Sequence, residues 1–284
     1  MIHIVTDSTC DIPRAEQKAL GLRVLPLTVN FGARVYRDGL DLEPSAFYEM
    51  LEKAAKLPTT SQINPGAFQD LFEDLTANGD YVVGIFLSSD LSGTAHSAMI
   101  AANAVCPERI FVVDSRSVSL GLGILVREAV RLRDEDQLDA AQLAKHLQKL
   151  ALRIRVYAVV DTLKYLKMGG RLSVGTAAIG GLLGIQPVIR VYGGVVEAVG
   201  KIRGEKAGMK FLEQRLKAHP PALNLPIGLG HAAAREKLER YSQHLKPILR
   251  GGAFHPGWIG TVIGAHAGPG VVGIAYFEKE AAAN

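Results

Sequence analysis

The sequence predicts an α/β fold of two domains, and three observations lead to this prediction. The chain has 284 residues, which is long for a single hydrophobic core. In its first half, short apolar runs alternate with helical segments, a pattern typical of right-handed crossovers between the strands of a largely parallel sheet flanked by helices. Near Asp161 this alternation gives way to a mixed order of strands and helices. We therefore expect an N-terminal α/β domain at residues 1–161 and a C-terminal α/β domain with a mixed sheet at residues 162–284.

The elements of the first domain follow from apolar periodicity and from punctuation by proline and glycine. Pro13 and Pro65 fit the first turn of a helix, and Gly79 lies just past a helix end. The polar stretch 32–41 is expected to form a loop or hairpin. Extended segments are expected at residues 3–6, 23–31, 81–87, 109–114 and 155–160. Helices are expected at residues 43–57, 65–79, 119–132 and 140–153, with another between the strand 81–87 and Pro107.

The second domain is expected to begin with a short helix and a glycine turn, and to continue with a hairpin around Gly193-Gly194. A helix at residues 204–219, a strand at residues 225–230 and a helix at residues 233–245 follow. The last segment, residues 257–277, is expected to form two strands joined by a Gly-Pro loop.

Composition excludes several classes of function. The net charge of +4 is too mild to indicate nucleic-acid binding, and no run of five like charges occurs. No stretch of about 18 apolar residues is present, so no integral membrane segment is expected. Cys10 and Cys106 fit no metal or redox spacing, and the histidines are scattered, so no metal site is expected. Without the pattern of a signal peptide at its start, the chain is expected to be cytoplasmic.

Three segments rich in hydroxyl groups point to an anion site. They are Thr6–Thr9, Thr59–Gln62 and Ser88–Thr94, each expected at a strand end or at a helix start. Ligands of open parallel sheets bind beyond the carboxyl ends of the strands, and backbone N–H groups at helix starts favour anions. Ser and Thr are also the preferred N-caps of helices, so each segment on its own has a purely structural interpretation.

An ordered set of motifs gives the chain a family resemblance. The segments "VTDSTCDIP", "TTSQINPGAF", "SSDLSGTAHSA", "VVDSRSVSLGLG", "DTLKYLKMGGRLS", "QPVI" and "GTVIGAHAGPGVVGIAY" occur in this order. With them the sequence resembles, from end to end, the DegV family, which includes the fatty-acid-binding subunit of bacterial fatty acid kinase. One departure is "SQIN" where the family commonly has "SQPS", so that Ile63 and Asn64 are expected to reshape that loop.

The resemblance implies a ligand and a partner. Such proteins bury one long-chain fatty acid between two α/β domains, and a separate ATP-dependent kinase subunit phosphorylates the bound carboxylate to acyl phosphate. The implied carboxylate contacts are Thr60, Ser92 and His266, with Ser61, Gly93 and Thr94 beside them in the same motifs. The chain itself is then expected to be a lipid-binding protein rather than an enzyme, with no catalytic residue and no cofactor.

Elementary energetics agrees with this division of labour. A bidentate Arg would occupy the lone pairs of a carboxylate that must attack phosphorus, whereas two hydroxyls and an imidazole hold it more loosely. Burial of about fourteen methylenes contributes roughly 11 kcal/mol before costs, so affinity is expected to come from the acyl tail. The glycine- and alanine-rich segments 119–126 and 177–189 are candidate walls of the tunnel, although close helix packing explains their composition equally well.

Three basic residues have two interpretations. Arg171 follows "MGG", and Lys201 and Arg203 follow the expected hairpin. Such charges usually form a solvated face. Where a kinase subunit docks, they would instead meet its acidic surface or neutralise the phosphoryl group in transfer.

Two other classes of function stay open at this point. A serine hydrolase acting on acyl esters would use Ser92 or Ser89 with His266, although the pattern G-x-S-x-G is absent. A nucleotide-dependent oxidoreductase is suggested by residues 228–233, which fit G-x-G-x-x-A between an expected strand and a helix. The P-loop motif is absent from the chain.

Overall fold

The computed structural model describes residues 1–135, 138–173 and 184–280 of the chain. It confirms the expected class: an α/β architecture with one parallel sheet flanked by helices and a second, mixed sheet. A third, small sheet lies beside them.

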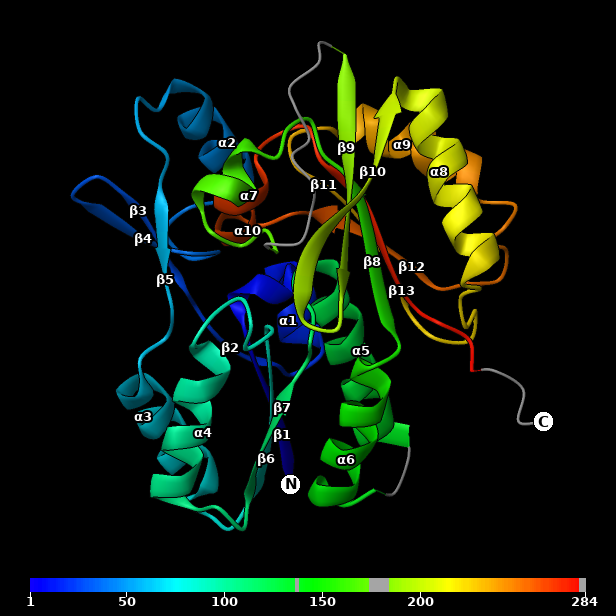
Figure 1. Cartoon of the computed structure of the whole chain (residues 1–284). Helices are drawn as coiled ribbons and strands as arrows, with labels where there is room; N and C mark the ends of the chain where they lie inside the picture. The colour runs from blue at the N-terminus through cyan, green and yellow to red at the C-terminus, as the bar shows by residue number, and fades with distance from the viewer. Residues whose placement is uncertain (136–137, 174–183, 281–284) are drawn as a thin grey trace.

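The first sheet is parallel throughout, with strand order β2-β1-β6-β7. Its strands are β1 (Ile2–Asp7), β2 (Arg23–Leu25), β6 (Tyr81–Phe86) and β7 (Ile110–Asp114). The central strand β6 is buried along almost its whole length, as its unbroken apolar run predicts for a strand covered on both faces. On one side lie α3 (Pro65–Thr76) and α4 (Thr94–Val105), and on the other lie α5 (Leu120–Glu135) and α6 (Ala140–Ala151) (Figure 1).

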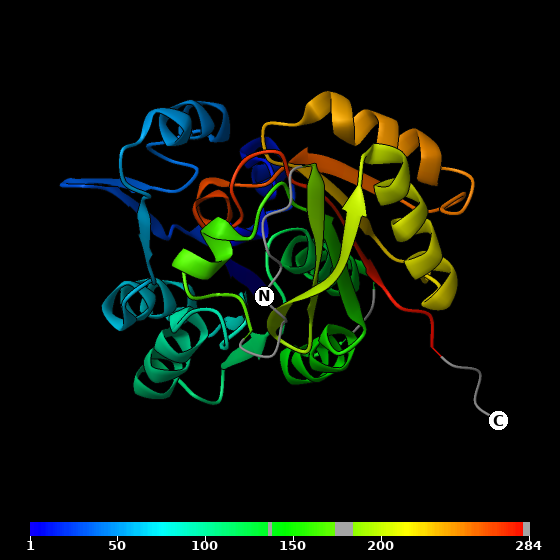
Figure 2. The same ribbon diagram turned by 45° about the horizontal axis from the view of Figure 1, so that its top comes forward.

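The second sheet has six strands in the order β10-β9-β8-β13-β11-β12, antiparallel except for the last pair. They are β8 (Ile154–Val159), β9 (Ile185–Tyr192), β10 (Val195–Arg203), β11 (Ile227–His231), β12 (Phe254–Trp258) and β13 (Val272–Phe277). The helices α8 (Glu205–Ala218) and α9 (Arg235–Leu245) cover its outer face, as Figure 2 shows from a second direction.

Helix α5 joins the two sheets, because it contacts β1 of the first and β8, β11 and β13 of the second. Its residues from Leu120 to Val126 are buried, which explains the unbroken apolar run there. Gly230 of β11 faces this helix, and a Cβ at that position would come within 2.7 Å of the Leu120 side chain. Residues 119–126 therefore have a packing role between the sheets, and Ser119 and Leu120 also line the cavity described below.

The small sheet, of order β4-β3-β5, contains β3 (Thr28–Phe31), β4 (Arg34–Arg37) and β5 (Thr59–Ser61). With α2 (Pro44–Lys53) it contacts α10 (Thr261–Ala267) from the far end of the chain, and α10 also contacts α7 (Lys164–Met168). Short elements complete the chain: the 3₁₀ turn η1 (Ser8–Cys10) and α1 (Arg14–Ala19). The polar stretch 32–41 forms the β3–β4 hairpin, one of its two expected forms.

One expected element is wrong. Residues 257–277 were predicted as two strands joined by a Gly-Pro loop, but Thr261–Ala267 form helix α10 between β12 and β13. Tertiary packing explains the difference, because a Cβ at Gly264 would come within 2.6 Å of both the Phe47 ring and the Tyr48 hydroxyl. A helix made of small residues fits against these aromatic rings of α2.

The division at Asp161 stays a prediction, and two features of the topology bear on it. Strand β8, placed before that residue, pairs with β9 and β13 and so belongs to the second sheet. The small sheet, which comes from the N-terminal half of the chain, packs against α10 from the C-terminal half. Each of the two predicted domains therefore contains an element that packs with the other domain.

Candidate functional site

A cavity of about 370 Å³ lies where the loops after β2, β6 and β7, the small sheet, α10 and the inner face of the second sheet meet. This volume is within the range of small-molecule pockets. Most of its wall is aliphatic, including Leu87, Val118, Val156, Ile189, Val191 and Val262. Its polar side chains are Thr60, Ser61, Gln62, Ser92, Ser119, Arg171 and His266. Two of these polar groups, Thr60 and His266, are hydrogen-bonded to each other, and the part of the wall around them is the polar end of this mainly apolar chamber.

Thr60 and His266 form the centre of the polar end. Thr60 lies on β5 and His266 in the last turn of α10, and Thr60 Oγ1 lies 2.8 Å from His266 Nε2. Thr60 was expected in a loop ahead of the helix that starts near Pro65; instead it lies within a strand of the small sheet, paired opposite Val29. His266 belongs to the segment 257–277, which was expected to form two strands and a Gly-Pro loop; instead the helix α10 fixes its direction.

The segment Ser88–Thr94 follows β6 at the carboxyl edge of the first sheet, as expected. Ser92 Oγ lies 3.0 Å from Thr94 Oγ1 and accepts a bond from the Thr94 N–H at 3.3 Å, so Ser92 orders the first turn of α4. Thr94 is fully buried and does not line the cavity among the described residues, whereas Ser92 and Gly93 do. Of this motif, Ser92 and Gly93 therefore face the ligand space and Thr94 supports them.

His266 is neutral at neutral pH in this structure. Burial, with a smaller contribution from the positive charge of Arg171, lowers the pKa of His266 from 6.5 to about 4. Its Nδ1 atom is buried without a hydrogen-bond partner among the described residues and lies against Gly169. A Cβ at Gly169 would overlap this nitrogen, so the close approach of α7 to the imidazole requires glycine.

Arg171 lines the cavity but directs its donors to the backbone. Its Nε donates to the Leu91 carbonyl at 3.2 Å and its Nη1 to the Gly169 carbonyl at 2.6 Å. It thus ties the loop after α7 to the segment that carries Ser92. Lys201 and Arg203 are exposed on β10, and neither lines this cavity in the described part of the chain.

The remaining predicted residues are placed as follows. Ser61 lines the cavity from β5. Of the two candidate walls, Ser119 and Leu120 from 119–126 and Ile189 from 177–189 line it. Residues 177–183 lie outside the described residues, so that part of the wall has no placement.

The sequence analysis included Gln62 in the segment Thr59–Gln62 but gave it no role of its own. Its Nε2 donates to Ser97 Oγ at 3.1 Å, and its amide group covers Gly93 so closely that a Cβ there would overlap Oε1. Gln62 therefore fixes β5 against the start of α4 and keeps Thr60 and Ser92 on one cavity wall. The sequence signal for this role is the position of Gln62 directly after the Thr-Thr-Ser run. The helix start that it covers, at Gly93, is far away in the sequence.

The geometry does not support the two other functions. Ser92 Oγ has Thr94 Oγ1 as its partner, and His266 Nε2 has Thr60 Oγ1, so no serine–histidine pair forms. Ser89 Oγ donates to Asp114 at 2.6 Å. Gly228 and Gly230 lie within β11 against α5, where their missing side chains allow close packing rather than binding of a pyrophosphate.

Within residues 1–135, 138–173 and 184–280, none of the helices has the length and apolarity needed to cross a membrane. No group of three or more His, Cys, Asp or Glu side chains gathers there in a way that suits a metal ion.

Fold and cavity together define an α/β protein with a mainly apolar small-molecule pocket. The chain belongs to the DegV family: the family model described as "Uncharacterised protein, DegV family" matches residues 1–279. A DegV domain-containing protein of Caldanaerobacter subterraneus is 37% identical over 279 residues, covering 98% of this chain and 99% of the relative. Protein DegV of Bacillus subtilis is 32% identical with the same coverage.

Solved structures show the same fold over nearly the whole chain. A DegV family protein from Thermus thermophilus, described as fatty acid binding, superposes with a TM-score of 0.89 at 33% identity, covering 98% of this chain and 99% of that one. DegV of Bacillus subtilis, described as a fatty acid binding protein, gives a TM-score of 0.84 at 33% identity with the same coverage. A stearic acid-binding protein from Eubacterium ventriosum gives 0.84 at 27% identity, again with the same coverage.

Proposed function

We propose that this protein binds one long-chain fatty acid in the cavity, with the carboxylate at Thr60, Ser92 and His266 and the acyl chain along the aliphatic wall. The observation that carries the proposal is the lining of the cavity, a mainly apolar chamber of about 370 Å³ with the hydrogen-bonded pair of Thr60 and His266 in its wall. The fatty acids described for the structural relatives support it. Burial of the methylenes supplies the affinity, and the polar end fixes the position of the head group.

The neutral imidazole explains how hydroxyl groups hold an anion there. Because His266 Nδ1 has no partner, the less costly tautomer places the proton on Nε2 and leaves a lone pair, rather than an N–H, unpaired at Nδ1. His266 Nε2–H then donates to Thr60 Oγ1, and the Thr60 hydroxyl proton is free to donate to the carboxylate. The ligand is held by polarised hydroxyls, and its oxygen lone pairs stay available.

The protein then acts as a substrate-presenting subunit rather than as an enzyme. A carboxylate oxygen attacks the γ-phosphorus of ATP held by a separate cytoplasmic kinase subunit, the bond from that phosphorus to the bridging oxygen breaks, and ADP and acyl phosphate result. Arg171 at the cavity wall is suited to face the phosphoryl group, and the exposed Lys201 and Arg203 to face an acidic partner surface.

Mass spectrometry of solvent extracts from the purified, denatured protein tests the first step. We expect about one fatty acid of roughly C14 to C18 per chain, the number of methylenes that the burial argument uses. Extracts from several preparations without stoichiometric fatty acid, together with no binding on titration, would contradict it. Addition of a fatty acid kinase subunit and ATP to the loaded protein tests the second step, with acyl phosphate, trapped by hydroxylamine, as the product. A chromogenic ester that the protein hydrolyses would instead favour the hydrolase.

A further inference from the structure

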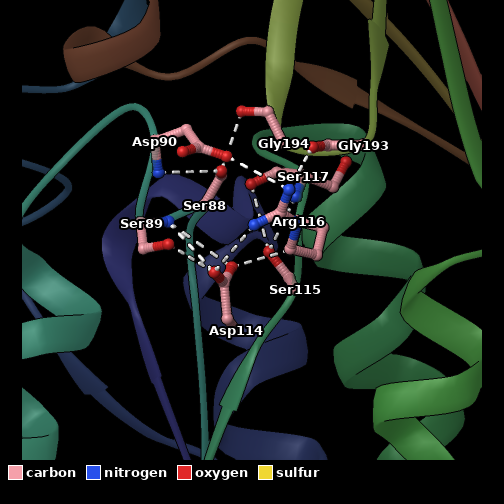
Figure 3. A network of polar contacts seen from close by, with 9 residues as sticks. All are labelled: Ser88, Ser89, Asp90, Asp114, Ser115, Arg116, Ser117, Gly193 and Gly194. Carbon is pink, nitrogen blue, oxygen red and sulfur yellow. Dashed lines mark hydrogen bonds and ion pairs between the residues drawn. The ribbon is translucent and has the colours of Figure 1, made fainter.

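The turn of the β9–β10 hairpin is held by side chains of the first α/β layer. Ser88 Oγ donates to the Gly194 carbonyl at 2.8 Å, and Arg116 Nη2 donates to the Gly193 carbonyl at 2.5 Å (Figure 3). Ser88 follows β6 and Arg116 follows β7, so two neighbouring loops of the parallel sheet grip two consecutive carbonyls of the second sheet.

Arg116 is set in place for this contact. Its guanidinium lies 3.2 Å from Asp90 Oδ2 and 3.9 Å from Asp114 Oδ2, which orient it toward the hairpin. Its backbone has a φ of 50°, a left-handed conformation that a residue with a Cβ adopts reluctantly. The Arg116 N–H donates to Asp114 Oδ1 at 2.8 Å and stabilises this conformation.

The hairpin side is shaped for the same contact. Gly194 has a φ of 97°, outside the region open to residues with a side chain. A Cβ there would come within 2.5 Å of Asp90 Oδ2 and within 2.9 Å of Ser88 Oγ. The turn and the two loops are thus complementary in shape as well as in hydrogen bonding, and Figure 3 shows the residues converging from both sides.

These contacts join three parts of the cavity wall. Val191 and Val196, which flank the turn, line the cavity, as do Leu91 and Ser92 after Asp90 and Val118 after Arg116. Movement of the hairpin away from the loops would separate these wall residues and open the chamber between them. Such an opening would ease the exit of a long acyl chain from the cavity.

We propose that Ser88 and Arg116 form an interdomain clamp on the Gly193-Gly194 turn, and that this clamp sets the rate at which a bound long-chain acid leaves the cavity. This inference rests on the proposed fatty-acid binding and adds positioning residues that do not touch the carboxylate. The ion pairs of Arg116 are partly exposed, with 38% of its side chain and 43% of that of Asp90 accessible. Salt therefore weakens the clamp and speeds release.

Stopped-flow dissociation tests the clamp. Protein loaded with cis-parinaric acid, a fluorescent C18 acid, is mixed with excess phosphatidylcholine vesicles that take up the released ligand. Arg116→Ala is expected to raise the dissociation rate about tenfold, as the loss of one charge-assisted hydrogen bond implies, with a smaller change in the association rate. Arg116→Lys, which keeps a charge but cannot bridge both carboxylates and a carbonyl, is expected to fall between. The rate of the wild type is expected to rise with salt, and that of Arg116→Ala to stay flat.

Matched controls separate the clamp from general loss of stability. Arg37→Ala removes an Arg–Asp pair confined to one loop, and it should leave the dissociation rate unchanged. Gly194→Ala should speed release, whereas Gly251→Ala, at a φ of 95° with no atom within 4 Å of the added Cβ, should not. Hydrogen exchange over residues 189–197 should be faster in Arg116→Ala, both with and without ligand.

The outcomes are distinguishable. Unchanged dissociation and unchanged hairpin exchange in an Arg116→Ala protein that still binds the probe would overturn the clamp and leave the proposed function standing. A wild type that binds no fatty acid would overturn the proposed function, and the role of the clamp in release with it.

Discussion

Thr60 Oγ1 and His266 Nε2 lie 2.8 Å apart although 206 residues of chain separate them. The hydroxyl comes from β5 of the small sheet and the imidazole from α10, near the C-terminus. The position of the proposed head-group site therefore depends on the docking of these two elements, and each can be disturbed separately.

Replacement of Thr60 by Val, which has nearly the same shape, should weaken fatty acid binding about five- to tenfold, because a hydrogen bond of about 1 kcal/mol is lost. The fold should survive a loss of this size. Phosphorylation by a kinase subunit should fall further, and Ser92→Ala and His266→Ala should behave alike. Calorimetric Kd and phosphorylation rate, measured in parallel, check this. Thr59→Val on the same strand is the control. If affinity and phosphorylation rate fall by the same factor, these residues only bind the fatty acid and do not promote its phosphorylation.

Gly169→Ala should displace the His266 ring, because the new Cβ would overlap Nδ1. We expect weaker fatty acid binding and a shifted imidazole NMR signal. The neighbouring Gly170 has a φ of 67° and open space around it, so Gly170→Asn, a residue that tolerates this conformation, serves as the control. An unchanged His266 signal in Gly169→Ala would show that α7 moves to make room for the new Cβ and that the ring stays in place.

Acid should destabilise the protein through His266. Its pKa of about 4 in the folded state lies below the 6.5 of the unfolded chain, so between these values the unfolded state binds more protons. This contribution to stability is present above pH 6.5 and is lost as the pH falls through that window, by an amount on the order of 1–3 kcal/mol. Thermal melts from pH 7.5 to 4.5 should show a flatter profile for His266→Asn than for the wild type. His96→Asn, at an exposed position on α4, should keep the wild-type slope.

Asp38→Asn should stabilise the ligand-free protein at pH 8. Burial raises the pKa of Asp38, while its hydrogen bonds oppose that shift, so the folded state holds the proton more tightly and stability falls as the pH rises above 3.8. Asp38 Oδ1 accepts from Thr261 Oγ1 at 2.7 Å, a role that an amide oxygen keeps, and Oδ2 has no partner among the described residues. The gain in Tm should shrink toward pH 4. Asp41→Asn is the control, and it should lower the Tm at pH 8 instead of raising it, since Arg37 lowers the pKa of Asp41 to about 2.

Arg203→Ala should leave fatty acid binding intact and weaken association with a kinase subunit. Arg171→Ala should weaken that association too, and it should also loosen the loop that Arg171 ties to Leu91. Because exposed charges are screened over about 8 Å at 0.15 M salt, the double variant should show a flatter salt dependence of association than the wild type. Surface plasmon resonance at several salt concentrations checks this. If the affinity for the kinase subunit and its salt dependence are unchanged in the double variant, both arginines are simply solvent-exposed charges.

The sequence by itself determined the family and most of the elements, although not helix α10. Apolar runs such as residues 81–87 and helix starts such as Asn64-Pro65 are local signals, since burial and capping act over a few residues. The motif order also named Thr60, Ser61, Ser92, Gly93 and His266, which line one cavity. Such motifs identify the side chains that carry the chemistry, but not how the fold brings these side chains together.

Only the tertiary structure decided how these residues meet. Whether Thr261–Ala267 becomes a strand or a helix depends on the space beside Phe47 and Tyr48, more than 200 residues away in sequence, and so no local pattern fixes it. The pairing of β8 with the second sheet, the cover of Gln62 over Gly93 and the grip of Arg116 on the β9–β10 turn likewise join distant segments. Their physical basis is packing and hydrogen bonding between elements, which exist only once the chain has folded.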